Sequence, residues 1–267
     1  MCRVSKVISL LTDFGLNDGY VGIMHGVILS ICPDARIVDI SHGIPPQDVR
    51  RAAYVLHISY PYFPEGTVHV VVVDPGVGSK RRAIAIRTSV GYFVAPDNGV
   101  LSYVLARERM LEAVELTNSR YWLPRVSATF HGRDVFSPVG AHLLCGVPMR
   151  ELGRPISDLV TFPMPAAKRQ SDGRLIGHVL HIDRFGNIIT DIRQDELPRD
   201  GNVAVRIRDR RISGVRTTYA TVPEGDLVAL IGSDGMLEIA VRNGNAAQDM
   251  GIQVGEEVVV SPLHNGA

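Results

Sequence analysis

The first half of the chain alternates short apolar runs with segments of helical periodicity. Apolar runs of strand length occupy residues 7–11, 36–40, 67–73, 82–87 and 92–95. Segments with apolar positions three and four residues apart occupy residues 20–31, 47–59 and 101–107. This alternation predicts a layered α/β domain with a mostly parallel sheet.

The second half has a different pattern. The change follows residues 160–173, a stretch with two prolines, two alanines and a final Asp-Gly that has the composition of a linker. Beyond it come short β-rich runs at 175–182, 188–192, 203–207, 227–231, 236–240 and 257–260. Such spacing is typical of a small all-β, barrel-like domain. We therefore predict an N-terminal α/β domain at 1–162, a linker at 163–173 and a C-terminal β-barrel-like domain at 174–267.

The run Val70–Val73 is the strongest strand signal, since four valines in a row are typical of a strand buried on both faces. It ends at Asp74, a glycine-rich turn follows, and then the pair Arg81 and Arg82. Ligands of open α/β sheets bind beyond the carboxyl ends of the strands. The segment is thus a candidate site, although an ordinary turn with solvated charges would show the same pattern.

Composition narrows the possible partners. The 267 residues are 45% hydrophobic, and 28 basic residues balance 28 acidic ones. A weak net field argues against a protein held to nucleic acid or to a membrane surface by bulk charge. We expect no membrane span and no secretory signal. The cysteines Cys2, Cys32 and Cys145 are too far apart to predict a disulfide framework or a metal site, which suits the cytoplasm.

Two more segments of the first half carry candidate chemistry. Asp13 follows the first strand, where a carboxylate can bind two vicinal hydroxyls of a ribose. Its alternative role is to cap the next helix, for which Asp18 is better placed. His131 precedes a glycine, Arg133 and Asp134, and a histidine among such groups can act as an acid or base. The alternative is an Arg133–Asp134 ion pair beside an uninvolved histidine.

The second half carries one candidate segment, which begins at Asp183. This carboxylate could bind an amine, Phe185 could stack on a flat ring, and Asn187 could bind a polar substrate. The alternative is a β-turn with Gly186 at positive φ. The segment from Ser233 to Val241 is a turn into a strand and indicates nothing by itself.

Taken in order, six segments resemble one family, the S-adenosyl-L-methionine (SAM) hydrolases. The segments are Thr-Asp-Phe-Gly, Val-Asp-Pro-Gly-Val-Gly, Ala-Pro-Asp-Asn-Gly, Phe-His-Gly-Arg-Asp, Asp-Arg-Phe-Gly-Asn and Ser-Asp-Gly-x-Leu-Glu-Ile-Ala. These enzymes are also called SAM hydroxide adenosyltransferases and are homologous to the fluorinase and chlorinase. The resemblance spans the chain from about residue 9 to residue 260.

The resemblance implies hydrolysis of SAM to adenosine and L-methionine by a homotrimer whose active sites lie at subunit interfaces, with no cofactor or metal. It implies the catalytic set Asp74, Arg81 and His131, with Arg81 preferred to Arg82 because it lies seven residues after Asp74. It assigns Asp13 to the ribose hydroxyls and Asp183 to the methionine amine. Further candidate substrate-binding residues are Asp18, Phe185, Asn187, Ser233, Glu238 and Val241.

Departures from the halogenases favour the hydrolase. The halogenases carry tyrosines where this chain has Asp74 and His131, and the fluorinase carries a serine at Gly132 and a tryptophan at Gln47. A sulfonium leaving group needs no protonation, so the site has only to align and activate water. Whether hydroxide or base-assisted water attacks stays open. The alternatives are a halide:SAM adenosyltransferase, a SAM or adenosine sensor, and a metal phosphohydrolase built on Asp13, Asp74 and His131.

Overall fold

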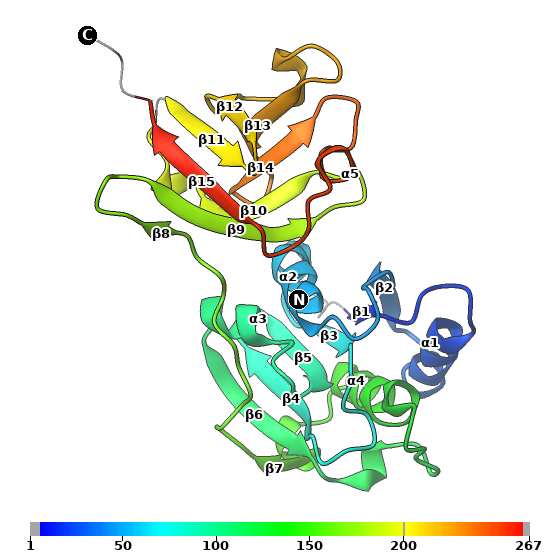
Figure 1. Cartoon of the computed structure of the whole chain (residues 1–267). Coiled ribbons are helices and arrows are strands. Elements are labelled where there is room, and N and C mark those ends of the chain that lie inside the picture. The colour runs from blue at the N-terminus through cyan, green and yellow to red at the C-terminus, as the bar shows by residue number, and fades with distance from the viewer. Residues whose placement is uncertain (1–5, 200, 264–267) are drawn as a thin grey trace. The chain divides into compact units, whose positions relative to one another are not determined.

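The structure is a computed structural model that describes residues 6–199 and 201–263, so Cys2 lies outside the described residues. The chain divides into two compact units between Met164 and Pro165 (Figure 1). Within the described residues, the first unit contains a seven-stranded sheet in the order β2-β1-β3-β5-β4-β6-β7. The strands are β1 (Val7–Thr12), β2 (Arg36–Ser41), β3 (Thr67–Val72), β4 (Ala83–Thr88), β5 (Gly91–Pro96), β6 (Met110–Leu116) and β7 (Gly153–Pro155).

The sheet is parallel where the candidate site lies. Strand β1 pairs in parallel with β2 and β3, and β3 pairs in parallel with β5. The pairings of β4 with β5 and β6, and of β6 with β7, are antiparallel. Parallel neighbours bring their carboxyl ends to one edge of a sheet, so the residues that follow β1 and β3 emerge side by side.

Helices cover both faces of this sheet (Figure 1). They are α1 (Tyr20–Ile31), α2 (Val49–Ser59), α3 (Ser102–Arg107) and α4 (Ser137–Leu144). Val70 and Val72 belong to the core shared with α1 and α4, whereas Val71 and Val73 belong to the core shared with α2 and α3. The valine run is thus buried on both faces, as the sequence predicted.

The start of α2 and the N-cap of α1 differ from the prediction, while α1 itself has the predicted bounds. Helix α2 begins at Val49 and not at residue 47, because Gln47 has a φ of 67° and Asp48 caps the helix through Arg51 N. Helix α1 has Gly19 as its N-cap without a side-chain cap, so the expected capping role of Asp18 is wrong. The sequence also gave no signal for β6, β7 and α4.

The second unit is an antiparallel, nearly closed barrel in the order β12-β11-β15-β9-β10-β14-β13, with β8 paired to β9. A bridge between Arg216 and Leu230 helps to close it. Its elements are β8 (Lys168–Arg169), β9 (Leu175–Ile182), β10 (Ile188–Arg193), β11 (Val203–Ile207), β12 (Arg210–Ser213), β13 (Leu227–Ile231), β14 (Met236–Val241), α5 (Ala246–Met250) and β15 (Glu257–Pro262). The predicted fold class is confirmed. Strand β8 lies inside the stretch predicted as a linker, and the sequence reading missed β12 and α5.

Among the described residues, no helix combines the length and the apolar character needed to cross a membrane.

Candidate active site

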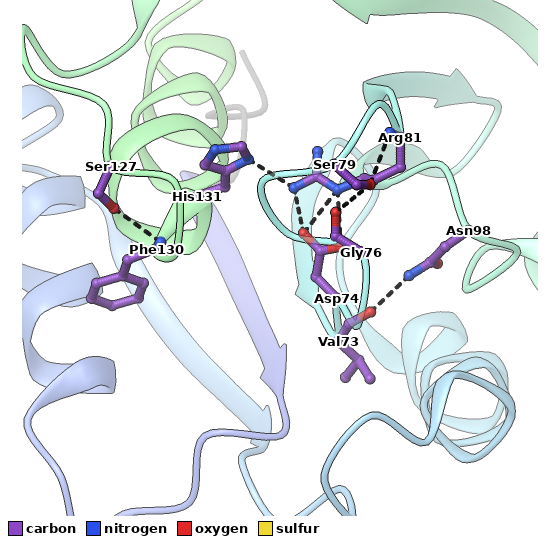
Figure 2. A network of polar contacts seen from close by, with 9 residues as sticks. All are labelled: Val73, Asp74, Gly76, Ser79, Arg81, Asn98, Ser127, Phe130 and His131. Atoms are coloured by element: carbon purple, nitrogen blue, oxygen red, sulfur yellow. Dashed lines mark hydrogen bonds and ion pairs between the residues drawn. The ribbon is translucent and has the colours of Figure 1, made fainter.

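The site is organised around the ends of β1 and β3. Thr12 pairs with Val72 in the register of these strands, so Asp13 and Asp74 follow at the same edge of the sheet. Asn98 Nδ2 donates a hydrogen bond of 2.9 Å to the carbonyl of Val73 and so holds the chain just before Asp74 (Figure 2).

A single guanidinium connects the three residues of the expected catalytic set. Arg81 Nε lies 2.9 Å from each carboxylate oxygen of Asp74, and Arg81 Nη2 also donates to Asp74 Oδ2. The same Nη2 lies 2.8 Å from His131 Nδ1 (Figure 2). The side chains of Asp74 and Arg81 are 5% and 11% exposed. The structure therefore brings Asp74, Arg81 and His131 together in one largely buried network.

Two loops distant in sequence meet to form this network. Gly78 has a φ of +75°, and a Cβ atom at this position would overlap the carbonyl oxygen of Ala128. The turn after β3 can therefore pack directly on the loop that leads to His131. His131 immediately precedes a π-helical turn, Gly132–Phe136, that continues into α4. Phe136 lies beneath the Arg81 guanidinium, 5.2 Å from ring centroid to Cζ.

The neighbouring arginine belongs to a different cluster. Arg82 donates to the buried carboxylate of Asp97 through Nε at 2.8 Å and to Asp158 Oδ1 through Nη1 at 2.7 Å. Successive residues of an extended segment project to opposite sides. Consequently Arg81 reaches Asp74 and His131, while Arg82 fastens the segment around Asp158 to the turn after β5.

The hydrogen bond from Arg81 determines how His131 can hold a proton. A guanidinium only donates, so Nδ1 must accept, and the proton of the neutral ring sits on Nε2. Burial lowers the pKa of His131, and the positive charge of Arg81 lowers it further. Asp74 and Asp134 act in the opposite direction. At neutral pH His131 is thus a neutral ring with an Nε2–H donor.

The Arg133–Asp134 ion pair is present beside this network. Arg133 Nε lies 2.6 Å from Asp134 Oδ1, and the Asp134 side chain is fully buried. Its second oxygen accepts from Ser127 N at 2.7 Å. The pair anchors the loop, while His131 contacts Arg81 instead of being uninvolved.

Asp13 lies in a loop with its own internal contacts. Its Oδ2 accepts a hydrogen bond of 2.7 Å from Gln47 N. The ring of Phe14 packs edge-on against Phe130, 5.7 Å between centroids, which joins this loop to the His131 loop. Asp18 is exposed.

Asp183, Phe185 and Asn187 form a tight turn in the second unit. Asp183 Oδ1 accepts from Phe185 N at 2.8 Å and from Asn187 N at 2.9 Å, and Oδ2 accepts from Asn187 Nδ2 at 3.0 Å. Gly186 has a φ of +85° and leaves no space for a Cβ beside Asn245. The turn interpretation is therefore confirmed. Phe185 is 75% exposed in this turn, so its ring is accessible for stacking on a flat ligand.

Glu238 lies near this turn and is 7% exposed. Its Oε1 accepts from Tyr219 Oη at 2.6 Å. Burial raises the pKa of Glu238, and the negative charges of Asp183 and Asp234 add to the rise. Tyr219 was not predictable from the sequence, because a tyrosine nineteen residues before its partner follows no motif. Ser233 lies in the turn before β14, and Val241 is the last residue of that strand.

Two family models match the chain: the SAM hydroxide adenosyltransferase N-terminal domain over residues 8–153, and the C-terminal domain over residues 177–259. The chain belongs to the SAM hydroxide adenosyltransferase family. The predicted resemblance is thereby confirmed, and the two matched stretches lie on either side of the boundary between the two units.

The relatives of this chain include proteins named as hydrolases and proteins named as fluorinases. The (R)-S-adenosyl-L-methionine hydrolase of Salinispora arenicola is 42% identical over 95% of this chain and 97% of its own length. That of Thermus thermophilus is also 42% identical, over 95% and 98%. A fluorinase of Actinoplanes is 30% identical over 96% and 98%. The crystal structure of a conserved protein of Thermotoga maritima superposes with a TM-score of 0.89 at 38% identity, over 95% and 99% of the two chains.

The position of Arg81 disfavours the metal phosphohydrolase that was considered as an alternative. A metal shared by Asp74 and His131 would have to occupy the position where the Arg81 guanidinium already contacts both. A fixed cation at this position disfavours a second cation beside it.

Proposed function

We propose that the protein hydrolyses SAM to adenosine and L-methionine through attack of water or hydroxide on C5′. The observation that carries the proposal is the contact of one guanidinium, Arg81, with both Asp74 and His131. The relatives named SAM hydrolases, at 42% identity, support this activity over the halogenation named for the fluorinases at 30%.

The reaction requires little acid–base chemistry. An oxygen–C5′ bond forms while the C5′–sulfur bond breaks, and its electron pair leaves with sulfur as the neutral thioether of methionine. One proton of the attacking water is released. We assign proton acceptance to Asp74. Its carboxylate has further lone pairs while it accepts from Arg81, whereas the single lone pair of His131 Nδ1 is already taken by Arg81. His131 Nε2–H then orients the water, and the positive charge of Arg81 stabilises its hydroxide character.

The remaining candidate residues are proposed to bind SAM. Asp13 is proposed to hold the ribose hydroxyls, and the acidic cluster of Asp183, Asp234 and Glu238 to attract the methionine ammonium and sulfonium. Phe185 is proposed to stack on adenine, since its ring is largely exposed. None of these roles needs a metal or an organic cofactor.

The decisive experiment incubates purified protein, dialysed against chelator, with SAM in oxygen-18 water and identifies the products by mass. Adenosine labelled at the 5′-hydroxyl and unlabelled methionine are expected. Label in methionine would refute attack at C5′. In a parallel sample with chloride, 5′-chloro-5′-deoxyadenosine would indicate a halide transferase, and SAM binding without turnover would indicate a sensor.

The names of the relatives suggest a stereochemical preference. Because "L" already specifies the methionine carbon, "(R)" specifies the sulfonium. We propose that this chain shares that preference. Separate assays of the two sulfonium epimers should show faster release of adenosine from the R form, and equal rates would refute the preference.

We further propose a closed cyclic homo-oligomer, a trimer by resemblance, in which the second unit of one subunit completes the site of its neighbour. Large apolar side chains on and around α1 and β2 support an interface at this edge of the first unit. They are Leu16, Tyr20, Ile23, Leu29 and Val38, each more than 40% exposed. We propose that the protein is cytoplasmic. Cys32 and Cys145 are distant in sequence but neighbours in the structure, and both are free thiols, as expected in a reducing compartment.

A further inference from the structure

A second cluster of chemically active side chains adjoins the Asp13 loop. His25 from α1, Asp39 from β2 and His42 just after β2 come together beside β2, which is an edge strand of the first sheet. His25 Nε2 lies 2.9 Å from Asp39 Oδ1, and His42 Nε2 lies 3.1 Å from the same oxygen. We propose that these three residues bind a divalent transition-metal ion of the zinc class.

The donor atoms have the spacing that such an ion needs. One nitrogen from each histidine and one carboxylate oxygen all lie within 4.8 Å of one another. Zinc–nitrogen and zinc–oxygen bonds are about 2.0–2.2 Å, which places tetrahedral donor atoms roughly 3.3 Å apart. Small side-chain movements would therefore close the site around an ion. Two imidazoles and one carboxylate favour Zn²⁺, Co²⁺ or Ni²⁺ over Mg²⁺ or Ca²⁺.

The state of His42 is the observation that separates a metal site from an ordinary ion pair. Its side chain is 3% exposed, yet Nε2 has no hydrogen-bond partner among the described residues. Asp39 Oδ1 lies 3.1 Å from this nitrogen, but the two atoms are not aligned for a hydrogen bond. A buried imidazole nitrogen without a hydrogen bond is costly unless another ligand takes its lone pair.

The other nitrogen of His42 has the partner that metal-binding histidines usually have. His42 Nδ1 lies 2.8 Å from the hydroxyl of Thr12, which is itself buried. When Nδ1–H donates to this oxygen, Nε2 presents its lone pair toward Asp39 and His25. In the single chain, His25 and Asp39 are about one third exposed, so an ion can reach them from solvent.

The site is mechanically connected to the proposed substrate loop but separate from its chemistry. The carbonyl of His42 accepts from Gly15 N at 2.8 Å, and Thr12 immediately precedes Asp13. A bound ion would therefore stiffen the Thr12–Gly15 loop. Metal binding can be measured without SAM, so its failure and the failure of the proposed hydrolysis are distinguishable.

The experiment uses full-length protein without a histidine tag, stripped with chelator and returned to metal-free buffer. Zn²⁺ binding is followed by calorimetry and Co²⁺ binding by its visible d–d spectrum. The variants are His25→Ala and Asp39→Asn, which change partly exposed side chains. The matched control is His178→Ala. His178 also faces a carboxylate, that of Asp191 at 3.7 Å, but among residues 6–199 and 201–263 it belongs to no cluster of three possible metal ligands.

One Zn²⁺ per chain is expected for the wild type and for the His178 variant, with a raised melting temperature in both. Loss of a ligand should weaken binding about 100-fold or more in the His25 and Asp39 variants and abolish the thermal shift. Equal Zn²⁺ binding by the wild type and the His25 variant would overturn the proposal. So would an equal loss in the His178 variant, or Mg²⁺ binding as tight as Zn²⁺ binding.

Discussion

His131 Nδ1 accepts a hydrogen bond from Arg81, whose guanidinium can only donate, so protonation of Nδ1 would break the network. Burial and Arg81 lower the pKa of His131 below its ordinary value of 6.5. The neutral form, present above the lowered pKa, is the active one. We therefore expect kcat/KM to fall as pH decreases through an inflection below 6.5. The profile of kcat/KM against pH checks this, and residual activity of His131→Gln should lack the same inflection.

Arg81 and Arg82 offer a matched pair of substitutions. Arg81→Lys keeps the charge but loses the planar donors that reach Asp74 and His131 together. We expect kcat to fall by about 100-fold or more with a smaller change in the affinity for SAM. Arg82→Lys should lower stability through Asp97 and leave kcat near the wild-type value. Steady-state kinetics with calorimetric SAM binding measure both, and an equal loss of kcat would contradict the assignment of Arg81.

The buried ring of His69 should make the folded protein less stable in acid. His69 is 2% exposed, lies 2.6 Å from Ser9 Oγ and stacks on Phe93. Burial lowers the pKa of His69 to about 4. The unfolded chain takes up this proton below pH 6.5 and the folded protein only near pH 4, so the free energy of unfolding should fall by roughly 3 kcal/mol across this interval. Denaturant unfolding at several pH values should show a smaller fall for His69→Gln, and an unchanged fall would contradict it.

At the scale of elements, strong apolar runs were predictable and small-residue helices were not. The run Val70–Val73 could be recognised because both of its faces meet a core. Helix α4 packs on the same strand through Gly140, whose position leaves no room for a Cβ beside Val70. Close packing by a glycine leaves little hydrophobic periodicity, so the sequence did not indicate this helix.

In the candidate active site, too, single residues were predictable but their contacts were not. The motifs singled out Asp74 and His131, but their connection needs a contact between loops fifty residues apart. Nor could composition bring His25 to Asp39, since they meet only when α1 packs beside β2. Residue type and local order are visible in a sequence, whereas convergence depends on the packing of whole elements.

The close contact of Gly78 with Ala128 holds the turn after β3 against the His131 loop. Gly78→Ala would place a methyl group against the Ala128 carbonyl and push the turn after β3 away from the His131 loop. A displacement of this kind should lower kcat by about 100-fold. The control is Gly225→Ala, because Gly225 has a similar φ of +81° but open space around it. Equal activity of both variants, measured after thermal unfolding has verified their folds, would contradict the argument.

At the scale of the whole molecule, the proposed active site draws on two units that fold around separate cores. Asp74 and His131 belong to the first unit, and Asn187 belongs to the second. If neighbouring subunits share each site, co-expression of two inactive variants, Asp74→Asn and Asn187→Ala, should restore activity. Random mixing in a cyclic trimer gives about a quarter of the sites two intact halves.

The control for this experiment is a pair of variants that both alter the first unit. Asp74→Asn and His131→Ala both alter the first unit, so none of their mixed oligomers contains a site with an intact first half. Co-expression of this pair should leave activity at the level of the separate variants. Recovery with Asn187→Ala but not with His131→Ala would establish shared sites. Absence of recovery in both mixtures, with mixed oligomers verified by two affinity tags, would show that each chain builds its site alone.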